Sequence, residues 1–186
     1  WSMPVRVSEE EIIGTFALTS FEPSSPTVFQ RRLLDTCAYI ASIIIRRHQS
    51  ETKLEHLAYH DVLTGLPNRT YLQASIEGFI SENERFSLIM FGLDRFKVIN
   101  DTHGHDIGDK VLVATANLLK SLLSAETRLF RVSGDEFVLS VKKSAKDLSV
   151  DSICAQLKTL YQTPIKINEW QFYLSGSMGV SSFNTE

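Results

Sequence analysis

Cysteine is scarce in this chain of 186 residues, which contains only Cys37 and Cys154. Two thiols so far apart in the sequence form neither a disulfide framework nor a zinc site, and they indicate small core residues in a reducing compartment. An excess of charge of one sign is also missing, since 19 basic and 22 acidic side chains leave a net charge of -3. This balance excludes bulk attraction of nucleic acid or of an anionic membrane surface, so any nucleotide must be held by local contacts.

Long hydrophobic runs are absent as well. No stretch approaches the roughly 20 apolar residues that a membrane helix requires, and no signal peptide is recognisable. The chain starts at Trp1 without a methionine, which indicates a piece of a longer protein. Apolar residues nevertheless make up 43% of the sequence, enough for a buried core, so we expect one compact domain and part of another.

The N-terminal region divides into a short β segment and a long helix. Residues 1–21 alternate between apolar and polar side chains on either side of an acidic turn at 8–11, which predicts a β-hairpin. The breaker-rich segment 22–26 follows, and Thr27 can then cap a helix that continues to about Ala58 without Gly or Pro.

One side of this expected helix carries apolar residues at the 4-3-4 spacing of a coiled coil. We call this set the seam: Leu33, Cys37, Ile40 and Ile44. The same register continues into the polar Arg47 and Glu51, so the seam is interrupted. Two roles remain open, a connector helix packed on a neighbouring domain or a helix that forms a homodimer.

Short motifs in this region resemble the C-terminal third of a GAF sensor domain. They are Trp-Ser-x-Pro, Gly-x-Phe-Ala-Leu and Pro-x-x-Pro-Thr, followed by a helix with Leu33-Leu34. The resemblance implies that residues 1–26 are the remnant of such a domain and that residues 27–58 are its connector or signalling helix. The ligand pocket of the sensor would then lie mostly in residues that the chain does not include.

From residue 59 onward, the pattern is that of a mixed α+β domain. The order of its elements predicts a mainly antiparallel central sheet flanked by helices, a ferredoxin-like βααββαβ arrangement. Helices are expected at 69–81, 106–124 and 148–161, and strands at 87–93, 127–132, 137–142, 165–167 and 171–181.

Four motifs follow one another in this part of the chain: DVLTGLPNR at 61–69, FGLDRFKVIND at 91–101, THGHDIGD at 102–109 and RVSGDEF at 131–137. They resemble the patterns D-x-L-T-x-L-x-N-R, F-D-x-D-x-F-K-x-I-N-D, G-H-x-x-G-D and G-G-[DE]-E-F of the GGDEF domain, the bacterial diguanylate cyclase family. Each motif alone is weak, but all four in order and at compatible spacings are a specific signal covering most of residues 56–183.

The resemblance implies a nucleotide-cyclase-like fold and a bacterial cytoplasmic protein. The family joins two GTP molecules, one on each domain of a dimer, into cyclic di-GMP, with Mg²⁺ or Mn²⁺ held by carboxylates. It implies that Asn100 and Asp109 read guanine, because an amide and a carboxylate match the donors and the acceptor of its Watson–Crick edge. Gly134 would let the backbone approach the triphosphate. Lys97 would face phosphate, although a solvated surface lysine is an equal alternative.

The same resemblance assigns the reactive centre to the hairpin motif. Asp135 would be a metal carboxylate, and Glu136 the essential acidic partner close to the reacting atoms. His103 and His105 have no carboxylate or thiol at a usual metal spacing, so turn and packing roles are expected for them.

Two residues depart from the family pattern at this centre. Gly92 stands where the family has the first Asp of its strand motif, which supplies a metal ligand. Asp94 would lie ~6–7 Å further along the strand. It is a weak substitute as a metal ligand, because Mg²⁺ requires contacts of about 2.1 Å in strict octahedral geometry. Ser133 replaces the first glycine of the hairpin motif, a milder change that a turn can tolerate.

Two further departures concern regulation and completeness. The inhibitory product site of the family requires Arg-x-x-Asp before the hairpin motif, and these two places hold Ser124 and Thr127, so product feedback is not expected. The sequence also stops at Glu186, before the last helix of the family, which brings basic residues toward the phosphates.

Together these features predict a GGDEF domain, residues 59–186, that binds GTP but is catalytically impaired. It would regulate a neighbouring C-terminal domain such as an EAL phosphodiesterase. One alternative is an active diguanylate cyclase that rebuilds its metal site from Asp94, Asp135 and water. The other is a purely structural or dimerisation module. Neither a nucleic-acid partner nor a membrane segment in this chain is expected.

Overall fold

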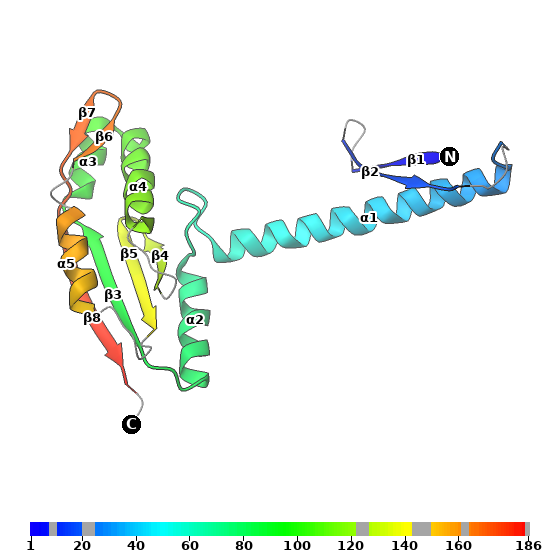
Figure 1. Ribbon diagram of the computed structural model, residues 1–186. Coiled ribbons are helices and arrows are strands. Elements are labelled where there is room, and N and C mark those ends of the chain that lie inside the picture. Colours follow the sequence, from blue (N-terminus) through cyan, green and yellow to red (C-terminus); the bar gives the residue numbers. More distant parts are fainter. Residues whose placement is uncertain (8–10, 20–24, 122–126, 143–149, 161–163, 185–186) are drawn as a thin grey trace. The chain divides into compact units, whose positions relative to one another are not determined.

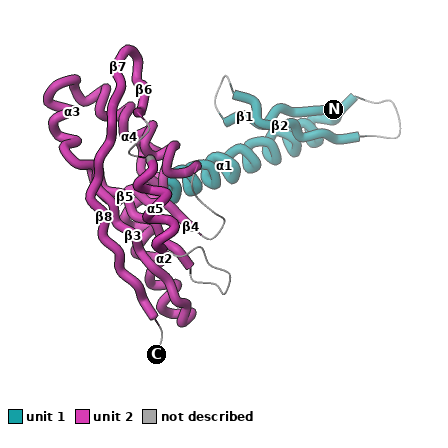
Figure 2. The backbone as a smooth tube through the Cα atoms, turned by 60° about the vertical axis from the view of Figure 1, so that its left-hand side comes forward, with its two compact units in different colours: residues 1–56 teal, residues 57–186 magenta. Residues whose placement is uncertain are grey.

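The computed structural model describes residues 1–7, 11–19, 25–121, 127–142, 150–160 and 164–184. The chain separates into two compact units, Trp1–His56 and Leu57–Glu186 (Figure 2). Within the described residues, no helix combines the length and the apolar character needed to cross a membrane.

The first unit contains the expected hairpin and most of the expected helix. Strands β1 (Ser2–Arg6) and β2 (Ile12–Ala17) pair in antiparallel fashion and lie along the first turns of α1 (Val28–Tyr59) (Figure 1). Val5 of the hairpin and Leu34 and Ala38 of the helix are the buried apolar residues among those described in this unit. Both predictions are confirmed.

The first turn of α1 is closed by a reciprocal pair of hydrogen bonds between Thr27 and Gln30. The Gln30 backbone N–H donates to Thr27 Oγ1 at 3.2 Å, and the Thr27 backbone N–H donates to Gln30 Oε1 at 2.8 Å. This arrangement is a capping box, which satisfies two backbone donors that the helix cannot pair itself.

Three of the four seam residues are largely uncovered in the first unit. Leu33, Ile40 and Ile44 are 47%, 50% and 61% exposed, whereas Cys37 is half-buried and the neighbouring Leu34 and Ala38 are buried. The seam therefore forms an apolar surface on this unit that its own residues leave uncovered.

The second unit is built on a four-stranded antiparallel sheet of order β4-β5-β3-β8. Its fold is the α+β arrangement expected from the sequence, with the βααββαβ order and an added two-stranded ribbon, β6–β7. The elements are α2 (Arg69–Ser81), β3 (Phe86–Leu93), α3 (Phe96–His103), α4 (His105–Lys120), β4 (Thr127–Ser133), β5 (Glu136–Lys142), α5 (Val150–Leu160), β6 (Ile165–Ile167), β7 (Trp170–Phe172) and β8 (Gly176–Phe183).

The two faces of the sheet are covered by different helices. Successive side chains of a strand point to opposite faces, and Ile89, Phe91 and Leu93 of β3 belong to the main core with residues of α4 and α5. The other face holds a smaller cluster formed by Leu72 of α2 with Phe130 and Val138. Figure 1 shows α2 and α5 on opposite sides of the sheet.

The structure differs from the expected elements in two places. The helix expected at 106–124 corresponds to α4, but α3, a helix not expected from the sequence, precedes it, and the two helices meet at Gly104, whose φ of 84° suits glycine. The expected strand 171–181 is split into β7 and β8, and Asn168, at φ 53°, makes the tight turn before β7. The predicted helix ends at 122–124, 148–149 and 161 lie outside the described residues.

Candidate functional site

Asn100 lies in the last turn of α3 and has an unusual environment for a polar side chain. Its Oδ1 atom is buried and has no hydrogen-bond partner among the described residues. An unpaired buried acceptor costs roughly 1–3 kcal/mol, so native structures rarely leave one without a reason. This oxygen is therefore an unpaired acceptor packed against α4, and a donor that the chain does not supply would satisfy it only after the amide turns toward that donor.

Asp109 and Lys97 lie on the same pair of helices. Asp109 is exposed on α4, directly after Gly108, and an ideal Cβ at Gly108 would lie 1.8 Å from Asn100 Oδ1. Lys97 is exposed three residues before Asn100, a spacing that puts both on one side of α3. Of the four expected nucleotide-binding residues, Asn100 and Asp109 therefore lie on neighbouring turns of α3 and α4, Lys97 lies in the first turn of α3, and Gly134 lies on the hairpin.

Gly92 occupies the position that the family fills with Asp. It lies in β3 opposite Glu136 of β5 on one side and opposite Ser177 of β8 on the other. No atom lies within 4 Å of an ideal Cβ at this position. A larger side chain here would therefore meet open space, on the same face of the sheet as Glu136.

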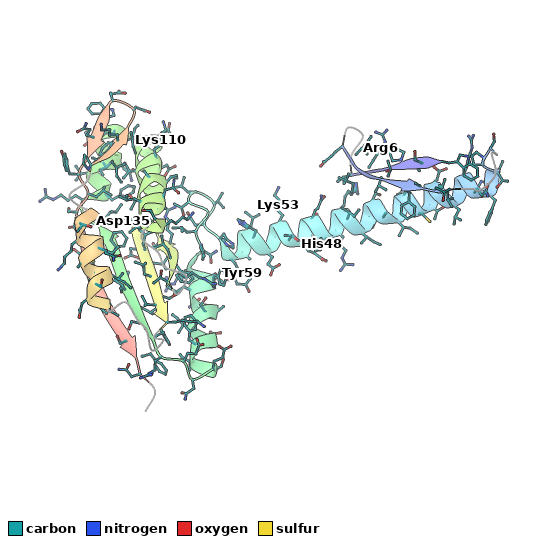
Figure 3. All side chains as sticks on the ribbon, in the orientation of Figure 1. Arg6, His48, Lys53, Tyr59, Lys110 and Asp135 are labelled. Atoms are coloured by element: carbon teal, nitrogen blue, oxygen red, sulfur yellow. The ribbon has the colours of Figure 1, made fainter. Side chains whose placement is uncertain are left out.

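The hairpin motif is attached to the end of β3. The backbone N–H of Leu93 donates to the Asp135 carbonyl oxygen at 3.2 Å, and both Asp135 and Glu136 are half-buried. Figure 3 shows Asp135 at the end of the sheet toward which β3 runs. Lys110 of α4 is labelled toward the same end of this unit. Ser133 is exposed and pairs with Glu136 at the start of the turn, so its side chain meets no crowding.

Asp94 is held on the other side of β3. It follows the last residue of the strand, and its carboxylate accepts a hydrogen bond from Ser177 Oγ at 2.9 Å. Its backbone N–H donates to Ser175 at 2.8 Å. Because β8 and β5 flank β3 on opposite edges, Asp94 is directed to the edge away from Asp135.

These carboxylates do not make a complete metal site. Among the residues that the structure describes, no three His, Cys, Asp or Glu side chains come together to hold a metal ion. Asp135 would therefore hold Mg²⁺ or Mn²⁺ only with phosphate oxygens and water in most coordination positions.

Arg131 and Asp61 belong to the sequence motifs, but the motifs alone gave neither residue a role. Arg131 donates through Nη1 to Asp61 Oδ1 at 2.8 Å, and through Nε and Nη2 to the Gly134 carbonyl at 2.9 and 2.7 Å. Asp61 also accepts from the backbone N–H and the hydroxyl of Thr64. The guanidinium thus joins the turn at 61–69 to the hairpin that carries Asp135.

The ionisation of Asp61 reflects these contacts. Burial alone would raise the pKa of this carboxyl group. The hydrogen bonds from Thr64 and Arg131, with the positive charge of Arg131, outweigh that effect and lower the pKa below its ordinary value. Asp61 is therefore a carboxylate that the fold stabilises in its charged form.

His103 has a packing role. Its ring lies 4.7 Å from the Trp170 ring and 5.3 Å from the Phe172 ring, measured between centroids. It therefore connects the end of α3 to the β6–β7 ribbon, which lies beside α3 and α4 in Figures 1 and 2.

A groove with a volume of about 600 Å³ opens between α2 and the sheet. Glu136 lies on its wall, and Met90 and Val180, which are 43% and 51% exposed, contribute apolar surface. The groove also includes Leu72, Ile76, Leu88, Val132 and Val138.

Residues 58–186 match the family model described as diguanylate cyclase, GGDEF domain. The chain belongs to the GGDEF family. The fold and the family expected from the four motifs are thereby confirmed.

Similar proteins are bacterial. The chain is 29% identical over 161 residues to the bifunctional diguanylate cyclase/cyclic di-GMP phosphodiesterase MucR of Pseudomonas aeruginosa, covering 84% of this chain and 23% of MucR. The crystal structure of the diguanylate cyclase SiaD from Pseudomonas aeruginosa, in complex with its activator SiaC, is similar with a TM-score of 0.60 and 27% identity. That match covers 84% of this chain and 62% of SiaD.

A sensory box/GGDEF family protein from Caulobacter crescentus is similar at 34% identity with a TM-score of 0.56, covering 68% of this chain and 84% of that one. The chain spans only 23%, 18% and 22% of the length of three of the curated relatives that it matches. This GGDEF domain is therefore compared with one part of much longer proteins.

Proposed function

We propose that this GGDEF domain binds GTP at the junction of α3 and α4, turns it over poorly or not at all, and uses nucleotide occupancy to regulate a neighbouring domain. The observation that carries the proposal is the buried Oδ1 atom of Asn100, which has no partner among the described residues and lies beside the helix that holds Asp109.

Guanine suits this pair of residues. Its Watson–Crick edge offers the N1–H and N2–H₂ groups as donors, and an amide oxygen and a carboxylate both accept. Binding would supply Asn100 with the hydrogen bond that it lacks, and it would pair Asp109 with a donor while Lys97 stays close to phosphate. Gly134 and Asp135 would approach the triphosphate from the hairpin.

We expect impaired turnover because the site has too few carboxylates to hold the catalytic metal ions. Gly92 supplies no carboxylate, and Asp94 is bonded to Ser177 at the opposite edge of β3. Metal-assisted phosphoryl chemistry needs cations that stabilise both the attacking and the leaving oxygen. Asp135 and Glu136 retain part of this function in a degenerate SGDEF motif, which supports nucleotide binding with Mg²⁺ or Mn²⁺ more than catalysis.

The test is incubation of the chain with GTP and Mg²⁺, followed by chromatography of the products and by calorimetry of GTP binding. We expect bound, unchanged GTP. No detectable binding would refute the proposal, and cyclic di-GMP in the product would refute the impairment. The Gly92→Asp variant serves as the positive control for turnover.

An active diguanylate cyclase is the alternative favoured by the retained Asp135 and Glu136 and by the names of MucR and SiaD. It predicts cyclic di-GMP from the unchanged chain and loss of that product in Asp135→Ala and Glu136→Ala. A purely structural module predicts instead that Asn100→Ala and Asp109→Ala alter local stability alone.

Partners of the domain follow from the first unit and from the relatives. We propose that the exposed seam of α1 forms a homodimer, which would transmit a signal from the remnant of a GAF-like sensor at residues 1–26. Relatives include MucR and the cyclic di-GMP phosphodiesterase PdeR of Escherichia coli, which supports a phosphodiesterase of the EAL class as the regulated neighbour in a bacterial cytoplasmic protein.

A further inference from the structure

Gly108 has no conformational reason to be glycine. It lies in the first turn of α4 with ordinary helical backbone, unlike Gly65, Gly104 and Gly134, whose φ angles are positive. Glycine inside a helix is unfavourable relative to alanine, because it loses more backbone freedom on folding. A buried helical glycine therefore points to a requirement for space.

The Asn100 side chain occupies the space that a side chain at position 108 would take. An ideal Cβ at Gly108 would lie 1.8 Å from Asn100 Oδ1, 3.0 Å from Asn100 Cγ and 3.3 Å from Phe96 Cζ. Real Cβ atoms essentially never approach another heavy atom to within 3.0 Å, so a side chain at 108 requires the Asn100 amide, the end of a flexible side chain, to leave its present place. Gly78 of α2 is a helical glycine without such a neighbour, since nothing lies within 4 Å of its ideal Cβ.

Van der Waals packing, not a hydrogen bond, holds the Asn100 amide oxygen in this place, because Oδ1 has no hydrogen-bond partner among the described residues. The position of the group thus depends on the surface that Gly108 and Phe96 leave for it. The next residue of α4 is Asp109, so the same turn sets the distance between the amide and the carboxylate.

We infer that Gly108 is a positioning residue for guanine recognition: its missing side chain lets the Asn100 amide lie against α4 next to Asp109. This inference rests on the proposed function for its ligand, but its steric part does not. A methyl group at 108 would push the amide away and leave Asp109 to read the base without it.

The test is a double-mutant cycle of Gly108→Ala and Asn100→Ala, read by GTP affinity and by melting temperature. We expect Gly108→Ala to weaken GTP binding about tenfold, the equivalent of one lost hydrogen bond to the ligand. It should also lower the preference for GTP over ITP, which lacks the 2-amino group, to the preference of Asn100→Ala.

The decisive comparison is the double variant. With Asn100 cut back to Ala, the methyl group at 108 meets no amide, so Gly108→Ala should cause no further loss of affinity and should raise the melting temperature. Gly78→Ala is the matched control, which should keep the GTP affinity of the unchanged chain.

Two results would overturn the inference: wild-type affinity in Gly108→Ala, or an equal loss of affinity from Gly108→Ala in both backgrounds. If the unchanged chain binds no GTP, the proposed function and the role of Gly108 in binding both fail. The melting temperatures then show separately whether Gly108 and Asn100 exclude one another, because independent sites would give equal shifts in both backgrounds.

Discussion

Arg131 donates to the Asp61 carboxylate across 70 positions of sequence, with its Nη1 atom 2.8 Å from Asp61 Oδ1. The side chains are only 11% and 24% exposed, and Nε and Nη2 of the guanidinium both donate to the Gly134 carbonyl. A planar guanidinium can bond two such groups at once, which a lysine ammonium does much less well. The hairpin that carries Asp135 is therefore anchored to the turn at 61–69.

Arg131→Ala should destabilise the second unit by about 2 kcal/mol, since it removes charged hydrogen bonds and leaves Asp61 half-buried without its cation. Urea denaturation followed by circular dichroism measures this change. Arg47→Ala is the control, because its ion pair with Glu51 is 79% and 59% exposed and should contribute about 0.5 kcal/mol or less. Equal effects of the two substitutions would show that the anchor has no special importance.

Asp61 should make the stability of the domain depend on pH in the acid range. Its folded-state pKa is lowered, so its contribution is fully present above the ordinary pKa of about 3.9 and is lost as the pH falls through the folded-state value. In Asp61→Asn, the unfolding free energy should be lower at pH 7 and should fall less steeply below about pH 4. Denaturation curves from pH 7 to pH 3 provide the comparison, and parallel curves for the two proteins would contradict the prediction.

Regular elements could be predicted because their patterns are local. The helix expected at 69–81 matches α2, where Asn68 accepts from the Tyr71 backbone N–H as a cap, and the strands expected at 127–132 and 137–142 match β4 and β5. α3 was missed because it has eight residues and follows Arg95, an N-cap residue with a φ of 57° that makes no side-chain capping hydrogen bond. Neither feature is a recognised start signal in sequence.

In the candidate site too, residues within local motifs could be predicted from the sequence, and contacts between distant residues could not. Asn100 and Asp109 could be named because they belong to motifs, and the departure at Gly92 was visible in the same motifs. The ion pair of Arg131 with Asp61 could not be derived, because no local pattern specifies a partner 70 residues away. The fit of Gly108 to Asn100 depends on how closely α3 and α4 approach, which only the packed structure determines.

Gly92→Asp should create a carboxylate directly opposite Glu136 without steric cost, because nothing lies within 4 Å of the ideal Cβ. Like charges opposite one another in a sheet repel, so the variant should lose about 0.5 kcal/mol of stability without divalent cations. Mg²⁺ or Mn²⁺ should reverse that loss and raise the melting temperature more than in the unchanged chain. The variant should also gain turnover of GTP to cyclic di-GMP.

Gly179→Asp is the matched control for that experiment. Gly179 lies opposite Met90 in the same sheet, and its ideal Cβ also meets no atom within 4 Å. The same change of residue is thus made in the same groove but opposite Met90 rather than opposite Glu136, and it should produce neither a cation-dependent melting shift nor turnover. A cation response in both variants would indicate non-specific binding of the metal to added charge.

Ile44→Glu should dissociate a dimer formed through the seam. Ile44 is 61% exposed on the isolated first unit, so the substitution removes no contact within that unit and should change its melting temperature little. In a coiled coil, however, the same position faces the partner helix, where two opposed carboxylates are unfavourable. Sedimentation equilibrium should therefore show a dimer for the unchanged chain and a monomer for Ile44→Glu.

Tyr39 is 66% exposed and lies off the seam, so Tyr39→Glu should remain dimeric. A monomeric unchanged chain, or a dimer that survives Ile44→Glu, would exclude the seam as the dimer interface and favour α1 as a connector packed on another domain.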